Sequence, residues 1–311
     1  MINKILDSTI YFSFDSSGFK RHAKSFEELD ARKIKGKNVL ITGGTSGIGL
    51  SCALELSKLG ANVIVTGRNE DKLQQNLKES YPEKDIELQF LRCDLNDFSS
   101  LKSFVSQVKE QFGNIDVFIC NAGGMPDKRE VTRSYDGIFA SQVVAHYFLI
   151  RSFIDEEVLI DGSHVSINSS GGMYPVKLDL ADLAWVERDY DKVASYAMAK
   201  RAQVIISELL AENYKNIIFS CSHPGWVDTP GLKDSLKSFW EFTKDRLRSV
   251  REGADTLIWL ATVGHKIESG KFWFDRKMRS PNLIPFTKVD FAYKLKLRKF
   301  LEEEVEYIKS L

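Results

Sequence analysis

The sequence predicts an α/β protein whose core is a doubly wound, parallel sheet of seven strands. Short apolar runs of strand length alternate with amphipathic helical stretches from residue 37 to about residue 280. A glycine-rich segment follows the first of these apolar runs directly. Strands that alternate with helices in this way are joined by right-handed crossovers, which place helices on both faces of a parallel sheet.

The expected elements follow in chain order from the spacing of apolar residues and from the residues that end each segment. Val39-Leu40-Ile41 is a continuous apolar run, as expected of a strand buried on both faces, and Gly60 ends the helix that comes next. Strands are expected at 37–42, 61–66, 86–92, 116–120, 163–167, 217–222 and 270–274. Helices are expected at 47–59, 70–79, 101–112, 137–153, 196–213 and 251–262.

The chain reads as one domain with an additional segment at each end. Residues 37–280 form the expected domain, 1–36 an N-terminal extension and 281–311 a C-terminal helical tail. The extension is too apolar for a disordered tail. We therefore expect it to pack on the domain or on a partner through its phenylalanines, Phe12, Phe14, Phe19 and Phe26.

Charge and cysteine content give no support for several classes of protein. The chain carries 43 basic and 43 acidic residues, so its net charge gives no argument for nucleic acid or for an anionic membrane. The cysteines have no metal-type spacing, and we expect no metal site and a reducing intracellular compartment, cytoplasm or mitochondrion. They are Cys52, Cys93, Cys120 and Cys221.

No membrane span is expected, because no run approaches the roughly 18 apolar residues that a span requires. The partly apolar segment 5–14 is interrupted by Asp7 and has no small-residue cleavage site after it, so it reads as neither a signal peptide nor a span. A surface-lying or partner-docking role for this segment stays open.

The glycine-rich turn is a candidate dinucleotide site. It comprises Thr42, Gly43, Gly44, Thr45, Ser46, Gly47, Ile48 and Gly49. Gly43, Gly47 and Gly49 let a strand turn sharply into a helix whose N-terminal amides can face a pyrophosphate, as in Rossmann-type folds. A glycine-rich turn without a ligand is the alternative, but the strand before it and the helix after it favour the ligand site.

The end of the second strand bears on the choice of cofactor. Gly67 stands where an acidic residue would bond the adenosine ribose, and Arg68 follows it. A guanidinium binds phosphate in a bidentate manner, so this pair favours NADP(H) over NAD(H). The alternative for Arg68 is a solvated surface arginine.

A second motif, Tyr196-Ala197-Met198-Ala199-Lys200, opens the helix expected at 196–213. Residues four apart lie on one face of a helix, so an ammonium there could lower the phenol pKa from about 10. The phenol would then serve as an acid or base. An amphipathic helix with an exposed lysine is the alternative.

The two motifs, in this order and separation, resemble the short-chain dehydrogenase/reductase family of NAD(P)-dependent enzymes. The resemblance implies that Asp94, with Leu95 beside it, bonds the adenine. It implies further that Asn121-Ala122-Gly123, after the fourth strand, supports the sheet and borders the cofactor. Taken as bare tripeptides, both segments could be ordinary turns.

The resemblance also implies the reacting groups. Ser170 would orient the substrate carbonyl, with Ser169 as the alternative, Tyr196 would transfer a proton, and Lys200 would bind the nicotinamide ribose. Residues 230–250 would form a lid over the substrate. The segment implied to contact the nicotinamide includes Pro224, Gly225, Val227 and Thr229.

One position departs from the family pattern. The helix after Asn121 usually contributes an asparagine that anchors a water in the proton relay, and Ala145 stands in its place. An alanine side chain neither donates nor accepts a hydrogen bond. Either a water or His146 fills the gap, or turnover is reduced or lost.

Within the family, the chain from about residue 10 to 280 is similar to the dehydrogenase/reductase member 12 group. The segments that carry this likeness are 128–130, 169–173, 223–226, 228–231, 245–249, 253–256 and 275–277. The resemblance does not identify a substrate.

Two functions from different classes remain. The first is an NADP-dependent enzyme that interconverts a lipophilic carbonyl and an alcohol, because the 25-residue stretch between Ser170 and Tyr196 could widen an apolar pocket. The second is a catalytically weakened or inactive family member that serves as a cofactor-binding structural subunit of a larger assembly, for example in mitochondria. Ala145 and the N-terminal extension motivate it, and the extension would dock. A homodimer and a nucleotide-binding regulator are further alternatives.

Overall fold

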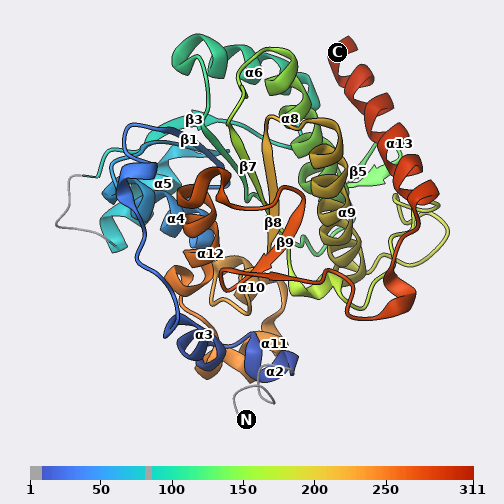
Figure 1. The fold of residues 1–311 in the computed structure, drawn as a ribbon. Helices are drawn as coiled ribbons and strands as arrows, with labels where there is room; N and C mark the ends of the chain where they lie inside the picture. The colour runs from blue at the N-terminus through green and yellow to red at the C-terminus, as the bar shows by residue number, and fades with distance from the viewer. Residues whose placement is uncertain (1–8, 81–85) are drawn as a thin grey trace.

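The computed structural model describes residues 9–80 and 86–311, and its centre is a mostly parallel sheet (Figure 1). Seven parallel strands are present, and a short eighth strand, β10, pairs antiparallel with β9 at one edge. The strand order is β10-β9-β8-β7-β4-β1-β2-β3. The bounds are β1 Asn38–Thr42, β2 Asn62–Gly67, β3 Gln89–Arg92, β4 Val117–Cys120, β7 His164–Asn168, β8 Ile218–Ser222, β9 Lys271–Phe274 and β10 Lys277–Arg279. The predicted fold is therefore confirmed, with one edge strand added.

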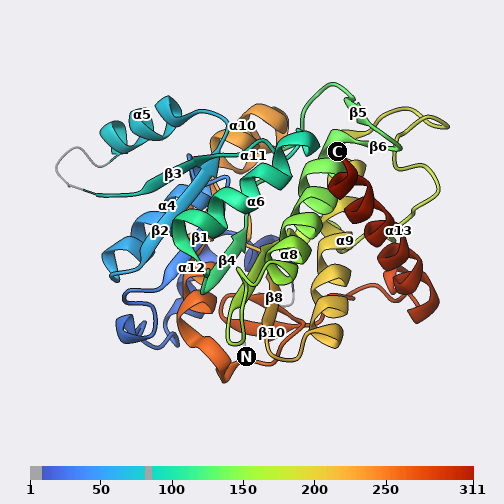
Figure 2. The same cartoon turned by 90° about the horizontal axis from the view of Figure 1, so that it is seen from above.

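Helices cover both faces of the sheet (Figure 2). Alternate residues of β1 show how the two layers arise, because Val39 and Ile41 pack into one apolar cluster and Leu40 into the other. On the first face lie α4 (Gly47–Lys58), α5 (Glu70–Ser80) and α12 (Val250–Val263). On the second lie α6 (Phe98–Phe112), α8 (His146–Asp155) and α9 (Lys192–Asn213).

Several boundaries differ from the predicted ones, among them the start of α6, which is at Phe98 and not at Leu101; three further differences have a clear physical reason or change the kind of helix. The strand expected at 86–92 begins only at Gln89, because it lies at the sheet edge and its register with β2 starts at Ile64. The helix expected at 137–153 is instead α7 (Gly137–Phe139), a π-helical turn at Ala140–Ala145, and α8. Helix α9 begins at Lys192, one turn before Tyr196, because the Asp191 side chain caps the amides of Val193 and Ala194.

The C-terminal residues end in a long helix, α13 (Phe291–Ser310), which packs across α8 and α9 (Figure 1). A short turn, Pro285–Thr287, precedes it. Beneath α13, the stretch Gly137–Asp155 is the one helical segment of the described residues long and apolar enough to cross a membrane. However, 83% of its apolar window is buried inside the protein, as in a core helix.

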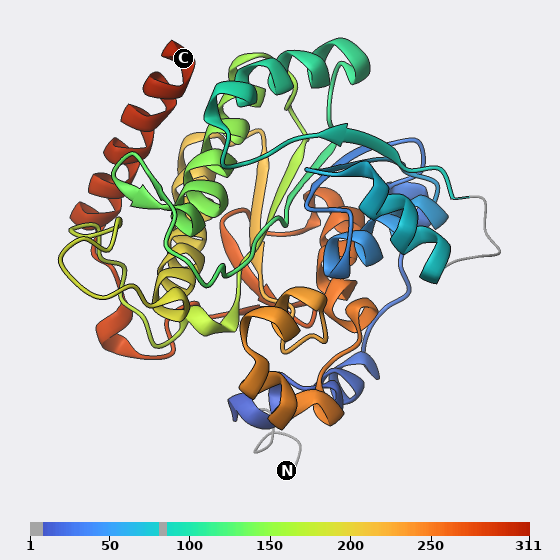
Figure 3. The ribbon, with the colours of Figure 1, turned by 180° about the vertical axis from the view of Figure 1, so that it is seen from behind.

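The N-terminal extension packs on the domain. It contains two short helices, α2 (Ile10–Ser13) and α3 (Ser16–Ala23), which lie beside α10 (Pro230–Ser235) and α11 (Lys237–Thr243) (Figures 1 and 3). Phe14 is buried in the apolar cluster that also contains Leu40, which we call the main apolar cluster, whereas Phe12, Phe19 and Phe26 are half-buried. We call residues 9–26 the N-terminal strap.

Candidate active site

The glycine-rich turn has no room for side chains at Gly43 and Gly49. A Cβ at Gly49 would lie 2.4 Å from the carbonyl oxygen of Gly43, and one at Gly43, which has φ +65°, would lie 2.8 Å from Cα of Ala122. Ser46 is the N-cap of α4 but makes no side-chain capping bond. The first amides of α4 are therefore not capped by the Ser46 side chain and lie beside a tight backbone turn, and a helix terminus of this kind suits a phosphate.

A buried network joins this turn to the next strand ends. The Thr42 hydroxyl accepts from the amides of Asn121 (3.0 Å) and Ala122 (3.1 Å), and it lies 2.9 Å from Nε2 of His146. The other ring nitrogen of His146 lies 3.1 Å from the carbonyl oxygen of Gln142, to which it can only donate. Nε2 therefore accepts from Thr42. Burial lowers the pKa of His146 to about 4, which keeps the ring neutral.

His146 consequently does not fill the gap beside Ala145, because both of its ring nitrogens are already bonded. Ala145 itself is fully buried at the end of the π-helical turn. The hypothesis that His146 replaces the missing asparagine is therefore wrong in this structure.

Of the residues expected to bind the adenosine end of the cofactor, only some have side chains that are free to contact a ligand. Thr45 lies over Gly67, where a Cβ would come within 2.6 Å of the Thr45 methyl, so an acidic side chain would clash. Arg68 is exposed next to this point. The Asp94 carboxylate accepts from the amide of Asn96 at 3.0 Å, whereas the Leu95 side chain points into the core.

The three expected reacting residues meet where β7 ends. The Ser170 hydroxyl accepts from the amide of Gly172 at 3.1 Å and is close enough to the Tyr196 phenol to lower the phenol pKa. The Lys200 ammonium lies 5.2 Å from the centre of the Tyr196 ring. Lys200 is buried and donates to the carbonyl of Asn168 at 2.9 Å. Ser169 faces away and donates to the backbone carbonyl of Lys200 at 2.8 Å. Of the two serines, Ser170 is thus the one that faces the phenol.

The expected lowering of the phenol pKa is absent. Burial raises the pKa of Tyr196 to about 12, and the neighbouring Ser170 hydroxyl opposes only part of this effect. Burial also lowers the pKa of Lys200 to about 8. The predicted effect of Lys200 on the phenol is absent because burial disfavours both charged forms, the phenolate and the ammonium. At neutral pH the phenol is protonated and is set up to donate a proton.

The segment after β8 borders the glycine-rich turn. A Cβ at Gly47 would lie 3.5 Å from the Thr229 methyl, so these two distant residues lie side by side. The Thr229 hydroxyl caps α10 by accepting from the amide of Leu232 at 3.1 Å. Val227 turns its side chain toward Gly253 of α12, so only its backbone can face a ligand. The Pro224 carbonyl accepts from Arg248 at 3.1 Å.

A cluster of buried amides near Lys200 was not predicted. Asn168 donates to Asn121 at 2.9 Å, and Gln203 donates to the carbonyl of Gln142 at 2.8 Å. One side-chain oxygen each of Gln142, Asn168 and Gln203 is buried without a partner among the described residues. Buried acceptors of this kind commonly hold ordered water. Their spacing in the sequence could have predicted this cluster, because Gln142 lies three residues before Ala145 and Gln203 lies three residues after Lys200. Residues three apart lie on the same side of a helix.

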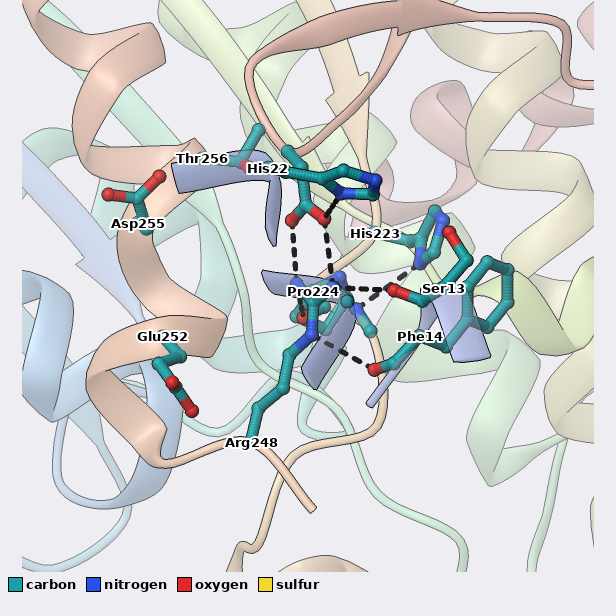
Figure 4. A network of polar contacts seen from close by, with 12 residues as sticks. Ser13, Phe14, His22, His223, Pro224, Arg248, Glu252, Asp255 and Thr256 are labelled. Atoms are coloured by element: carbon teal, nitrogen blue, oxygen red, sulfur yellow. Dashed lines mark hydrogen bonds and ion pairs between the residues drawn. The ribbon is translucent and has the colours of Figure 1, made fainter. Parts of the chain in front are cut away.

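The strap contributes a second unpredicted feature, Phe14. A Cβ at Gly171, the residue after Ser170, would lie 2.4 Å from the Phe14 ring. The same ring lies 4.5 Å from that of His223 and 6.2 Å from that of Trp226. Arg248 holds the strap by donating to the carbonyls of Ser13 (3.0 Å) and Phe14 (2.9 Å) (Figure 4). The strap therefore forms a wall beside the serine.

The fold and this arrangement define a nucleotide-binding α/β protein with a serine–tyrosine–lysine site. The family model for short chain dehydrogenases matches residues 37–181. The human dehydrogenase/reductase SDR family member 12 is 36% identical over 277 residues, which cover 87% of this chain and 86% of that protein. The chain belongs to the short-chain dehydrogenase/reductase family of oxidoreductases.

More distant similarities are found in sequence and in structure. Human retinol dehydrogenase 13 is 26% identical over 80% of this chain and 79% of its own length. The structure of L-sorbose reductase from Gluconobacter frateurii, in complex with NADPH and L-sorbose, superposes with a TM-score of 0.58 at 23% identity. That alignment covers 79% of this chain and 97% of the reductase, and it shows the shared fold.

Proposed function

We propose that the protein is an NADP-dependent reductase or dehydrogenase that interconverts a lipophilic carbonyl and the corresponding alcohol. The observation that carries this proposal is the contact between Ser170 and Tyr196 with Lys200 behind them, at the sheet edge that also holds the glycine-rich turn. Ligands of doubly wound sheets bind at this edge, beyond the carboxyl ends of the strands.

The residues of the glycine-rich turn would hold the cofactor. The open amides of α4 and the Ser46 hydroxyl suit its pyrophosphate, and Thr229 borders the same space. Arg68 would bind the 2′-phosphate, while the packing of Thr45 on Gly67 leaves no room for the carboxylate that would favour NAD. When bound, the cofactor supplies or accepts the hydride.

Proton transfer falls to Tyr196. Because burial holds its pKa near 12, the phenol carries its proton at neutral pH and donates it to the carbonyl oxygen during reduction. Ser170, which faces the phenol, would orient the same oxygen. Lys200 would bond the ribose and resupply the proton, and water held by the buried amides near Gln142 and Gln203 would complete the path.

The surroundings of Ser170 favour a lipophilic substrate. Phe14, Tyr174 and Trp226 form an aromatic group on one side of it, with the Phe14 ring 6.3 Å from that of Tyr174. These aromatic rings offer few of the hydrogen-bonding groups that a sugar-like substrate would need. The relative named retinol dehydrogenase supports the same substrate class.

The test is oxidation of NADPH by the purified full chain with a panel of medium- and long-chain aldehydes, ketones and quinones. Tyr196→Phe should abolish turnover but leave NADPH affinity nearly unchanged, whereas Lys200→Ala should reduce both. Tyr214→Phe, a half-buried tyrosine outside this site, is the control and should behave as wild type. Full activity of Tyr196→Phe would refute the mechanism. Tight NADPH binding without turnover of any carbonyl would favour the structural-subunit alternative.

A further inference from the structure

An exposed apolar and basic surface lies between β10 and the first turns of α13. We call residues 277–299 the basic–apolar patch. Its second part, from the loop at 283–290 into the first turns of α13, lies at the end of α13 opposite the C-terminus (Figure 1), whereas β10 lies at the sheet edge beside β9. Large apolar side chains project from it into solvent, namely Met278 (55% exposed), Leu283 (55%), Phe286 (65%), Phe291 (62%) and Leu295 (42%). Single exposed apolar residues need no explanation, but a concentration of them indicates a contact surface.

The patch is also strongly basic, although the whole chain is neutral. Residues 277–299 contain seven lysines or arginines and one acidic residue, Asp290. Asp290 is occupied as the N-cap of α13, where it accepts from the amide of Tyr293 at 2.7 Å. Two of the seven cations pair with acidic residues, Lys294 with Glu208 and the exposed Lys299 with Glu303 at 3.9 Å. The exposed ones are Lys277, Arg279, Lys288, Lys296 and Lys299.

The charge reverses along α13. Beyond Lys299 the helix carries Glu302, Glu303, Glu304 and Glu306. The apolar and basic side chains are therefore confined to the first half of the helix and to the loop before it. Such a distribution gives the helix one end suited to an anionic surface and one end that such a surface repels.

The backbone of the patch is fixed from the inside. Arg201 of α9 donates to the carbonyl of Pro281 (2.8 Å) and to Asn282 (3.2 Å), and its guanidinium reaches the Thr287 hydroxyl (3.4 Å). The Tyr293 hydroxyl accepts from the amide of Leu180 at 2.8 Å. The outward-pointing side chains thus sit on an anchored support.

We propose that the basic–apolar patch binds the surface of an anionic lipid bilayer, with Phe286 and Phe291 inserted among the headgroups. Apolar and aromatic side chains framed by lysine and arginine are typical of surfaces that lie on, but do not span, acidic membranes. A second copy of this chain is a poor occupant, because it would bring one set of seven cations against another.

The test is co-sedimentation of the full chain with vesicles of pure phosphatidylcholine and with vesicles containing about 30% phosphatidylserine. Wild type should pellet with the anionic vesicles at least about tenfold better than with neutral ones. Binding should weaken in about 0.5 M salt, which screens charge. It requires neither cofactor nor turnover, so its outcome is independent of the proposed enzyme activity.

Two double variants and one control locate the surface. Phe286→Ser/Phe291→Ser and Lys296→Glu/Lys299→Glu should each lose most of the binding, and both change only exposed residues. Phe242→Ser removes an even more exposed phenylalanine (78%) on α11 and should bind as wild type. Circular dichroism checks that each variant is folded.

Three results would overturn the proposal. Wild-type binding by both double variants would place the contact elsewhere, and equal sedimentation with neutral vesicles would remove the role of charge. Absence of vesicle binding, together with a dimer in ultracentrifugation that Phe286→Ser/Phe291→Ser dissociates, would instead assign the patch to self-association.

Discussion

Arg248 and Asp275 form a buried ion pair in which both guanidinium NH₂ groups contact the carboxylate, at 2.6 and 2.9 Å. Each side chain is only 1% exposed. Burial would raise the pKa of Asp275, but the bonds from His22 and Arg248 reverse this effect and lower it. Because Arg248 also bonds the carbonyls of Ser13 and Phe14, this pair connects the strap to the end of β9 (Figure 4).

Arg248→Met should therefore loosen the strap as well as destabilise the fold. Removal of one partner of a buried ion pair costs about 3–5 kcal/mol, because the other charge stays buried and unpaired. Denaturant unfolding measures this cost, and trypsin cleavage near Lys20 and Arg21 reports release of the strap. Arg251→Met, at a pair whose arginine is 76% exposed, is the control and should cost less than about 1 kcal/mol. A stable Arg248→Met with an intact strap would contradict the assignment.

Arg68→Ala should weaken NADP(H) binding by roughly 1–3 kcal/mol and leave NAD(H) binding nearly unchanged. The reason is that the guanidinium would meet only the extra phosphate. Isothermal titration with both cofactors measures the difference, and Arg251→Ala serves as a control for loss of one surface charge. Equal losses for the two cofactors would disprove a role in phosphate recognition.

Ser170→Ala and Ser169→Ala should have different effects, although the residues are adjacent. Ser170 faces the phenol, so its loss should reduce kcat/KM by about 100-fold or more. Its hydroxyl also caps the turn Gly171–Met173, so a cost of about 1 kcal/mol in the free energy of unfolding is expected as well. Ser169 bonds the Lys200 carbonyl, so its loss should appear mainly in the free energy of unfolding, by about 1 kcal/mol. Steady-state kinetics and denaturant unfolding of both variants decide the matter, and reversed effects would exchange the two roles.

Ala145→Asn should raise turnover by about tenfold if the missing relay group limits the reaction. The site is fully buried, so the larger side chain should also cost about 1–3 kcal/mol of stability. Ala145→Val adds volume without a polar group and should bring the cost but not the gain. A wild type that is already fast, with Ala145→Asn no faster, would mean that the buried amides supply the relay.

Acid should destabilise the protein through His146. Its pKa is about 4 in the folded protein, against an ordinary value of 6.5 in the unfolded chain, so between these values the unfolded chain binds more protons. The free energy of unfolding therefore falls as the pH falls through this window, by about 2 kcal/mol from pH 7 to pH 5 for this one group. His146→Gln should remove that share of the pH dependence. An unchanged slope would mean that His146 does not titrate as described.

The sequence predicted what depends on local pattern. The buried strands are visible because runs such as Val39–Ile41 must be apolar on both faces, and Tyr196 and Lys200 meet because they are four apart on one helix. The contact of Phe14 with Gly171 joins distant parts of the chain and depends on Arg248, so no local pattern contains it. The π-helical turn at Ala140–Ala145 was also invisible, since its residues continue the apolar pattern of a regular helix.

Helix α13 limits how far the chain can be shortened from its C-terminal side without loss of the folded state. It lies across α8 and α9, and the faces that it covers belong to the main apolar cluster. A fragment that stops before Asp290 would keep every residue of the candidate active site. It would nevertheless present those apolar faces to water, and expression of such a minimal fragment should yield aggregates in place of a smaller enzyme.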